Sequence, residues 1–525
     1  MDWVSNDITP EFQTKDLKGR FHERDSRRKG IVDLARACSA LTIPTLMPPE
    51  GHNVNDALPT PYQGLGARAV QNLASKLLLT LLPPNSPFFK FGLDTMMLEE
   101  MKEQLGEEGI ETQVNSKLRK LEEIIAKYIE ESALRVVIFR ALKYLIVTGN
   151  ALLDLSDERG RVYRMDHYIL RRDSLGQPVE IIYREVIDIT EVPEEMVGSV
   201  SANTQTTNGK EGLEMYTGMI WNGLIWEFSQ EINGVEVPGS RATYPKGKLP
   251  YIPLAWNRND GDDWGTGHVQ DNIGDFNSYE GLRKAITEGA LAAARLVFMV
   301  DPNGMTDVGE LQRTRNGGFC AGRREDIEAI QVDKGADFRV AQEEARKIEE
   351  QIGHGFLMMQ SIQRAGERVT AEEIRIMAQE LEDTLGGIYS VLALELQLPT
   401  VNILMAQLTR RKKLPHLPKG LSPTITTGFE ALGRGHDLRK LETFIQYLSP
   451  LGPEVIKERI NVGDYATRLG TGLGLSTDGL VYTEDQVATN KSQEMMMMMA
   501  QQGMGAAVGP MANAAAGAMV GQPEG

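Results

Sequence analysis

The sequence predicts an α+β protein that is mainly helical, with one sheet-bearing region and a small module held between two long helices. Three observations support this fold class. Apolar residues recur at helical spacing over residues 110–149 and through most of the second half of the chain. Residues 151–253 instead carry short apolar and aromatic runs separated by turn sequences such as INGV. Residues 301–336 combine glycines, turns and short apolar pieces between two helical patterns.

Length and composition limit the classes of protein to consider. At 525 residues the chain is too long for one simple core, so roughly two to four structural units are expected. A hydrophobic fraction of 41% and a charged fraction of 25% are ordinary for a globular protein, so most of the chain can fold. The net charge of -17 argues against a protein that grips nucleic acid along a broad basic face.

The cysteines and the N-terminus indicate where the chain is made. Cys38 and Cys320 lie far apart with no CxxC or Cys/His cluster, which leaves no disulfide framework and no thiolate zinc site. Synthesis in a reducing, intracellular compartment is therefore expected. The start MDWVSNDITPEF lacks the basic and apolar parts of a signal peptide. Because Arg140 and Lys143 interrupt the most apolar stretch, LRVVIFRALKYLIVTG, no membrane span is expected.

Helical periodicity predicts the order of the main elements. Residues 110–149 carry two apolar helical patterns, the second with Gly149 as its C-cap. The sheet-bearing region includes a polar stretch over 197–212 that is expected to be an exposed loop. After this region, one long helix is expected from His268 to Val300. A second long helix follows over residues 337–359. The two helices therefore flank the compact module.

The stretch QRAGERVTAEEI, residues 363–374, is basic within an acidic chain. Arg364 and Arg368 lie on either side of Gly366, which gives the backbone conformational freedom. Two interpretations of this loop stay open at the level of the local pattern. The arginines either pair with neighbouring Glu side chains on a solvated helix connection, or they bind a negatively charged partner.

The helix after this loop has a marked start and an expected kink. Thr370 and Glu373 fit a capping box, in which the Thr hydroxyl accepts from a free amide of the first turn and the Glu side chain reaches back to the cap amide. The glycine pair Gly386 and Gly387 predicts a bend, and Pro399 predicts a break. Residues 495–525, rich in Met, Ala and Gly, cannot build a core and are expected to be flexible or ordered only by a partner.

Motifs for catalysis, cofactors and metals are missing. The chain has no GxxxxGK[ST] phosphate loop, no HExxH and no GxSxG. The sequence from Gly64 to Val70 is only superficially like a dinucleotide loop, because no strand pattern precedes it and the third glycine is missing. Residues 257–267 offer oxygen ligands, either for a divalent ion or for a polar turn that caps the next helix. We therefore expect no enzyme, no catalytic residue, no cofactor and no assigned metal site.

Several longer phrases occur together and in order. They are RRKGIVDLARACSALTIPTLMPPEG, TPYQGLGARAVQNLASKLLLTLLPP, YPKGKLPYIPLAWNRNDGDDWGTGHV, QRAGERVTAEEIRIMAQELEDTLGGIYSVLALELQLP and PTITTGFEALGRGHDLRKLE. In order, spacing and chain length they are very similar to the portal, or head-to-tail connector, proteins of T-seven-like short-tailed bacteriophages (podophages). The resemblance covers about Arg24 to Asp485.

The resemblance implies a portal fold that assembles into a dodecameric ring at one vertex of the capsid. By segment it implies an α/β wing over 1–266, a stem helix over 267–300, a clip over 301–336, a returning stem helix over 337–359, a tunnel loop over 360–370, a kinked wing helix over 371–430 and a crown over 431–494, followed by the 495–525 tail. The functional expectation is a channel through which the terminase motor packages double-stranded DNA and the genome later leaves.

The same resemblance implies roles and partners. Arg364 and Arg368 of every subunit would meet at the constriction of the channel and touch phosphates without reading bases. The expected partners are the terminase large subunit, the tail adaptor, and the major capsid, scaffolding and internal core proteins. The protein would be made in the host bacterial cytoplasm and reside in the virion. The alternative is a non-conducting internal scaffold or tail adaptor of the virion.

Overall fold

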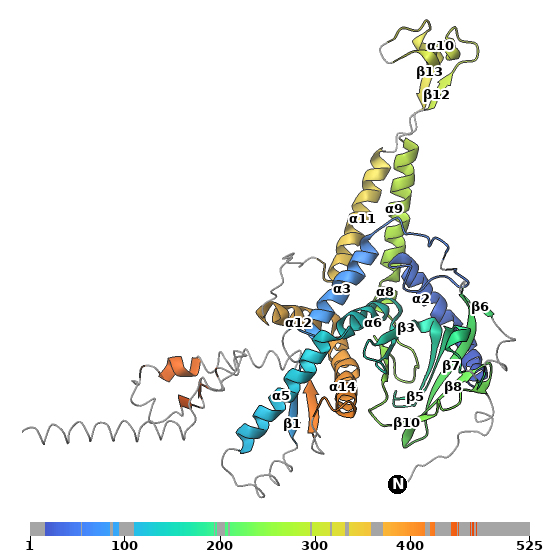
Figure 1. The fold of residues 1–525 in the computed structure, drawn as a ribbon. Helices are drawn as coiled ribbons and strands as arrows, with labels where there is room; N and C mark the ends of the chain where they lie inside the picture. Colours follow the sequence, from blue (N-terminus) through green and yellow to red (C-terminus); the bar gives the residue numbers. More distant parts are fainter. Residues whose placement is uncertain are drawn as a thin grey trace, which may run out of the picture. The chain divides into compact units, whose positions relative to one another are not determined.

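The computed structural model divides into two compact units, Met1–Gly428 and Phe429–Gly525, and all named elements belong to the first (Figure 1). The structure describes residues 16–53, 55–84, 88–93, 110–193, 195–196, 205–207, 210–293, 297–315, 318–330, 335–358, 371–414 and 421–425, with short pieces between 443 and 469. Most of the expected crown and the whole 495–525 tail lie outside the described residues.

Three helices, two apolar and one amphipathic, contribute to the main core of the first unit. They are α3 (Leu65–Leu81), α5 (Ile110–Glu131) and α6 (Leu134–Thr148). Helices α3 and α6 are apolar on most sides and are therefore buried, with Leu73, Leu77 and Ile146 fully excluded from solvent. Helix α6 ends at Gly149, whose φ of 76° and close approach to the backbone of residues 265–267 leave no room for a side chain. The predicted C-cap is confirmed.

The sheet-bearing region folds as an antiparallel sheet with the strand order β10–β8–β7–β5–β4. Its strands are β4 (Tyr168–Arg172), β5 (Pro178–Ile187), β6 (Gln205–Thr207, on β7), β7 (Lys210–Trp221), β8 (Ile225–Ile232), β9 (Val235–Glu236, on β8) and β10 (Ala242–Pro245). Alternation along β5 supplies two cores, because Ile182 packs with helix α1 (Leu17–Arg27) and Ile181 packs in a separate cluster with Tyr251. The described part of residues 197–212, predicted to be a loop, pairs as β6 with the start of β7.

Two smaller sheets connect distant parts of the chain. Strands β11 (Tyr251–Ala255), β2 (Asn150–Asp154) and β3 (Arg161–Tyr163) form one of them. In the other, β1 (Phe89–Leu93) pairs with β14 (Leu421–Ile425). The expectation of helix across 371–430 is therefore wrong at its end, where Phe89 opposes Ile425 in an antiparallel ladder. Helix α2 (Lys29–Leu41) packs beside α6.

Helices α9 (Ile273–Ala293) and α11 (Gly335–Gly355) lie side by side and run antiparallel (Figure 1). The contacts show the direction. Phe276 packs against Phe356, and the Tyr279 hydroxyl donates to Glu349 at 3.1 Å. Further along α9, Gly289 lies against the ring of Phe338. A short helix, α8 (His268–Asp271), precedes α9.

The helix expected from His268 to Val300 stops short of its predicted end. Helix α9 ends at Ala293, and Val297–Val300 is strand β12, which pairs with β13 (Ile327–Ile330). The β-branched sequence of this stretch suits a strand once a partner strand is present. The inserted module therefore begins earlier than residue 301, and it contains α10 (Val308–Arg313) between its two strands.

The helix that follows the arginine loop is interrupted at the glycine pair. Helix α12 (Ala371–Leu385) is followed by α13 (Ile388–Leu392), with Gly386 between them at a φ of 59°. The expected break at Pro399 is absent. Instead a π-helical turn, η6 (Ala393–Gln397), leads directly into α14 (Leu398–Arg410). A widened turn accommodates the missing N–H and the bulky ring of proline without ending the helix.

In the described part of the chain, one helical stretch, Ile388–Arg410, is long and apolar enough to cross a membrane. Its inward face is part of the main core, where Leu392, Leu396, Val401 and Leu404 are buried. A core helix passes the same test of length and composition. The segment is therefore a core helix in this fold.

Candidate functional site

The described structure reaches both flanks of the predicted DNA-contacting loop. Four of the predicted site residues lie outside the described residues: Arg364, Gly366, Arg368 and Thr370. Glu373 lies in the first turn of α12, and Gly386 and Gly387 separate α12 from α13. The candidate site is therefore built from the end of α11, the start of α12 and the helix α3 that contacts both.

The end of α11 has a tight, locally strained geometry. The amide of Met358 donates to the carbonyl of Gly353 at 2.7 Å, and the amide of Leu357 donates to His354 at 3.1 Å. These two bonds form a Schellman C-cap, which usually has glycine in the left-handed position. Here Leu357 occupies that position with a φ of 55°. A leucine in this conformation costs about 1–2 kcal/mol, so neighbouring groups must hold it in place.

Side chains from two other helices satisfy the free carbonyls of this C-terminus. His268 places Nε2 2.9 Å from the Gly355 carbonyl, and Asn72 of α3 donates to the carbonyls of Phe356 and Leu357, both at 3.0 Å. Burial lowers the pKa of His268, while its bond to the Gly355 carbonyl opposes that effect. The imidazole is therefore a neutral donor through Nε2.

Lys76 on α3 completes the arrangement. Its Nζ donates to the Leu357 carbonyl at 2.9 Å and lies 3.1 Å from a carboxylate oxygen of Glu380 on α12. Only 7% of Lys76 is exposed, so this ion pair is largely removed from water. We call Asn72, Lys76, His268 and Glu380 the α11 socket. The socket holds both described flanks of residues 359–370 against α3.

Contacts between α3 and the kinked helix continue beyond the glycine pair. The hydroxyl of Tyr389 donates to the Thr80 carbonyl at 3.3 Å, and the Gln397 amide donates to the Leu81 carbonyl at 2.5 Å. Gln397 closes the π turn, so this bond fixes the widened segment to the C-terminus of α3. Helix α3 thus supports the chain before and after the kink.

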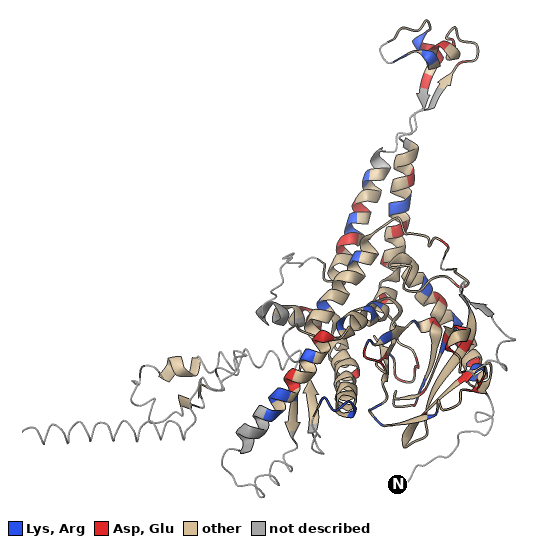
Figure 2. Cartoon of the chain, viewed as in Figure 1, with Lys and Arg blue, Asp and Glu red and all other residues tan. Residues whose placement is uncertain are grey.

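Charged side chains of both signs alternate along the exposed parts of α9 and α11 (Figure 2). On α9, Arg283, Lys284 and Glu288 are exposed, and on α11 the pair Lys347–Glu344 is exposed with a separation of 2.8 Å. Mixed charge of this kind gives no continuous basic strip. A polyanion close to this surface would meet attractive and repulsive groups in turn.

The inserted module is held mainly by polar contacts. A carboxylate oxygen of Asp326 accepts from the amide of Met305 and the hydroxyl of Thr306, both at 2.9 Å, and the Thr306 hydroxyl lowers the pKa of Asp326. Among the described residues 299–328, only Thr306 is buried. Phe319 is 100% exposed and Met305 78%. The module therefore presents apolar side chains to its surroundings.

Helix α1 is joined to the large sheet by ion pairs. The carboxylate of Glu180 on β5, with no exposed surface, lies 2.5 Å from Arg20, 3.0 Å from Arg24 and 3.3 Å from Arg171. Three guanidinium groups around one carboxylate compensate its burial. These contacts fix α1 on the sheet.

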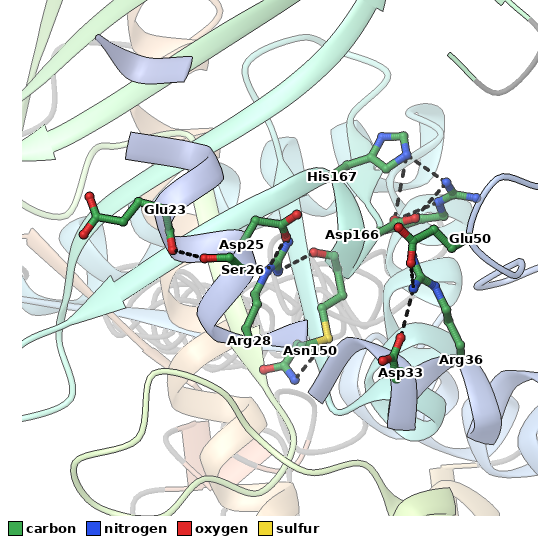
Figure 3. A network of polar contacts seen from close by, with 12 residues as sticks. Glu23, Asp25, Ser26, Arg28, Asp33, Arg36, Glu50, Asn150, Asp166 and His167 are labelled. Atoms are coloured by element: carbon green, nitrogen blue, oxygen red, sulfur yellow. Dashed lines mark hydrogen bonds and ion pairs between the residues drawn. The ribbon is translucent and has the colours of Figure 1, made fainter. Parts of the chain in front are cut away.

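A second polar network lies where α1 meets α2 (Figure 3). The buried guanidinium of Arg28 donates to Asp25 at 2.7 Å and to the Met165 carbonyl at 2.6 Å, and it stacks on Trp264. Nearby, Arg164 approaches Nε2 of His167 at 2.8 Å. Because arginine can only donate, His167 accepts through this nitrogen.

Two cavities in the described part of the chain have linings that share no residue with the α11 socket. One of about 320 Å³ is lined by α2 and the loop after it, and one of about 430 Å³ is lined by Asp154, Glu185 and Tyr251. Burial raises the pKa of Asp154 and of Glu185, and Tyr163 donates to Glu185 at 2.9 Å. No group of three His, Cys, Asp or Glu side chains placed to hold a metal ion occurs in the described part of the chain. In the 257–267 loop, Asp263 instead accepts from the Arg172 amide at 2.6 Å.

The residues that form these helices and the inserted module lie within the span of one known protein family. Residues 14–481 match the family described as bacteriophage head to tail connecting protein. The chain belongs to this family. Membership gives the chain a portal function at the junction between phage head and tail, and so places it in the phage particle.

Several phage portal proteins are similar to the chain over most of its length. The portal protein of Enterobacteria phage T3 is 38% identical over 519 residues and the match covers 96% of each chain. The portal protein of Escherichia phage T7 is 37% identical, with 88% of each chain covered, and that of Enterobacteria phage SP6 is 31% identical, with 84% covered. The predicted family is confirmed.

Solved structures of gene transfer agent particles show a weaker likeness to the connecting protein. A chain of the virion of the native particle matches 78% of this chain and 90% of its own length, with 13% identity and a TM-score of 0.35. A chain of the neck of the empty particle gives 13% identity and a TM-score of 0.37, with 72% and 86% covered. These values are too low to transfer parts of one structure onto the other.

No pattern in the sequence predicted the α11 socket. Asn72 and Lys76 lie about three hundred positions before Glu380, and the three residues fit no motif. One local signal was present, since a lysine within the apolar pattern of α3 is unusual and must find a partner when buried.

Proposed function

We propose that this chain forms a ring of about twelve copies with a central channel, through which a terminase motor packages double-stranded DNA and the genome later leaves. The observation that carries the proposal is the antiparallel pair α9 and α11 with an inserted module at one end, in a chain that matches the connecting family over residues 14–481. In a cyclic ring, each subunit places its helix pair beside the symmetry axis, and the neighbouring pairs together form a continuous channel wall.

The segments of the chain take the following roles in the proposal. Residues up to 266 form the wing, α8, α9 and α11 form the stem, residues 297–330 form the clip, and residues 360–370 form the tunnel loop. The clip is extended by its β12–β13 ladder relative to the boundary expected from the sequence. Helices α12 to α14 return to the wing, and residues 431–494 form the crown.

Arg364 and Arg368 contact DNA phosphates at the constriction of the ring. The support is their position on the loop between α11 and α12, both of which are attached to α3. Each copy brings a formal charge of -17, so the arginines are local contacts in an object that otherwise repels DNA. Weak, sequence-independent contacts of this kind allow sliding.

The chain acts mechanically and carries out no catalytic step of its own. The energy of packaging comes from the terminase large subunit, which meets the clip during packaging. A tail adaptor replaces it at the clip afterwards, and the wing and crown contact the major capsid, scaffolding and internal core proteins. The chain is made in the cytoplasm of the host bacterium before it enters the particle.

Electron microscopy of the purified full-length chain tests the proposal. Class averages should show closed rings of about twelve subunits with a lumen wide enough for duplex DNA, about 20 Å. Closed rings whose lumen is filled, or open assemblies, would instead support a non-conducting scaffold or tail adaptor. A stable monomer at micromolar concentration and moderate salt would rule out both.

A further inference from the structure

A single buried ammonium group contacts the end of α11, just before residues 359–370, and the middle of α12, the helix that follows them. Lys76 donates to the Leu357 carbonyl, just before the segment, and pairs with Glu380, nine residues into the helix that begins just after it. Asn72, one turn earlier on α3, holds the carbonyls of Phe356 and Leu357. Two consecutive turns of α3 therefore bind both flanks.

Helix α3 would be buried without the charge of Lys76. Helix α3 is already excluded from solvent through Leu73 and Leu77, and a lysine in that environment loses hydration that the Glu380 carboxylate must compensate. A methionine would fill the same space without that cost. The ammonium group instead fixes a geometry, because its three donors reach a carbonyl at the end of α11 and a carboxylate in the middle of α12 at once.

Leu357 shows why such a clamp is required. Its left-handed backbone is disfavoured for leucine, and the Schellman bonds at Met358 and Leu357 persist only while neighbouring groups hold this geometry. His268 binds the previous carbonyl, Gly355, from α8. The residue that decides where the chain leaves α11 is thus fixed by side chains of α3 and α8.

We propose that Asn72, Lys76 and Glu380 act as a latch that fixes the C-terminus of α11 and the middle of α12 on α3, and so sets where the tunnel loop with Arg364 and Arg368 leaves α11. The inference deepens the proposed function and rests on it for the role of the loop. The latch residues are positioning residues, since they act on DNA only through the loop that they hold.

The test compares assembled rings of the full-length chain carrying Lys76→Met, or Lys76→Met with Glu380→Met. The single variant leaves the Glu380 carboxylate unpaired, whereas the double variant removes both charges and should keep the wild-type melting temperature. Lys347→Met is the matched control, because it breaks an exposed ion pair with Glu344 on the same α11. All variants should form rings.

The first measurement is hydrogen exchange at the amides of Leu357 and Met358. Exchange should be about tenfold faster in both the single and the double variant, because opening of the C-cap no longer requires the latch contacts to break. Exchange in the control should be unchanged. Wild-type exchange in both latch variants would overturn the inference, whatever the loop does.

The second measurement is the amount of DNA retained per filled head. Heads with the double variant should lose DNA as heads with Arg364→Ala and Arg368→Ala do. Fast exchange with normal retention, while the arginine variant loses DNA, would overturn the positioning role. Fast exchange with normal retention in both would leave the latch supported as an anchor of the two flanks and would reject the proposed role of the arginines.

Discussion

His167 is a half-buried histidine whose surroundings keep its imidazole neutral. Burial, together with the guanidinium groups of Arg164, Arg184 and Arg28, lowers the pKa of His167 to about 4, although Asp166 opposes them. In the unfolded chain the same imidazole takes up a proton near pH 6.5. Between these two values the unfolded state binds more protons than the folded state, so the free energy of unfolding falls as the pH falls.

Because the pKa of His167 differs between the folded and unfolded states, the protein should lose stability at a pH above the usual pKa values of carboxylates. Stability should be unaffected above about pH 7 and should decrease by at most ~1.4 kcal/mol per pH unit between pH 6.5 and 4. Since 33% of the side chain is exposed, solvent screening reduces the effect. His167→Gln keeps an acceptor for Arg164, and urea unfolding at pH 7.5 and pH 5 should show a smaller loss in the variant. Equal losses in the two proteins would contradict this assignment.

The arginines of the tunnel loop should affect DNA and not assembly. Arg364→Ala with Arg368→Ala is expected to leave ring formation intact, because side chains of a loop contribute little to core burial, and to reduce DNA packaged and retained per head as phosphate contacts are lost. Arg27→Ala with Arg241→Ala removes the same charge from exposed sites elsewhere and is the control. Normal filling, retention and infectivity of the loop variant would show that Arg364 and Arg368 form only exposed ion pairs. Such pairs contribute about 0–1 kcal/mol to the free energy of unfolding.

At the scale of elements, the inserted module can be tested as a separate part. Replacing residues 294–334 by a short Gly/Ser linker should leave α9, α11 and ring formation unchanged and abolish binding to both motor and tail adaptor. Phe319→Ser is the finer variant: because this ring is fully exposed, the change should weaken partner binding about tenfold without altering the melting temperature. Normal binding of both partners by rings without the module would show that the partners meet another face.

The same elements show what sequence patterns can predict. Helical spacing predicted α5, α6, the pair α9 and α11, and the interruption at Gly386, because each depends on residues within a few turns of one another. Val297–Val300 was assigned to a helix because its partner strand lies about thirty residues away. The pairing of β1 with β14 joins segments more than three hundred residues apart. At Pro399 the local rule failed because a π turn relieved the strain.

The site was predictable only in part for the same reason. The basic loop, its glycine and its capping box are visible as a continuous stretch. The side chains that hold its flanks come from α3, α8 and α12, and Lys76 has no neighbour in sequence that explains it. Convergence of this kind requires the tertiary fold.

For the whole molecule, ring formation should appear in solution as a stability that depends on concentration. If folded chains are stabilised by their neighbours, the melting temperature should rise as the protein concentration increases from about 0.1 to 10 micromolar, since association lowers the free energy of the folded state only. Differential scanning fluorimetry over that range measures the shift. A melting temperature that stays constant, together with monomeric sedimentation, would contradict assembly through native contacts.

The antiparallel pairing of α9 with α11 has a consequence for how such particles diversify. Because Gly289 and Phe338 lie against one another, the two points at which the module joins the body are neighbours in space although they are far apart in the sequence. A foreign segment with nearby ends can be grafted there without moving the rest of the fold. If the module binds motor and tail adaptor as proposed, recombination between phages exchanges the binding specificity of the particle as one segment, while the body of the protein is inherited unchanged.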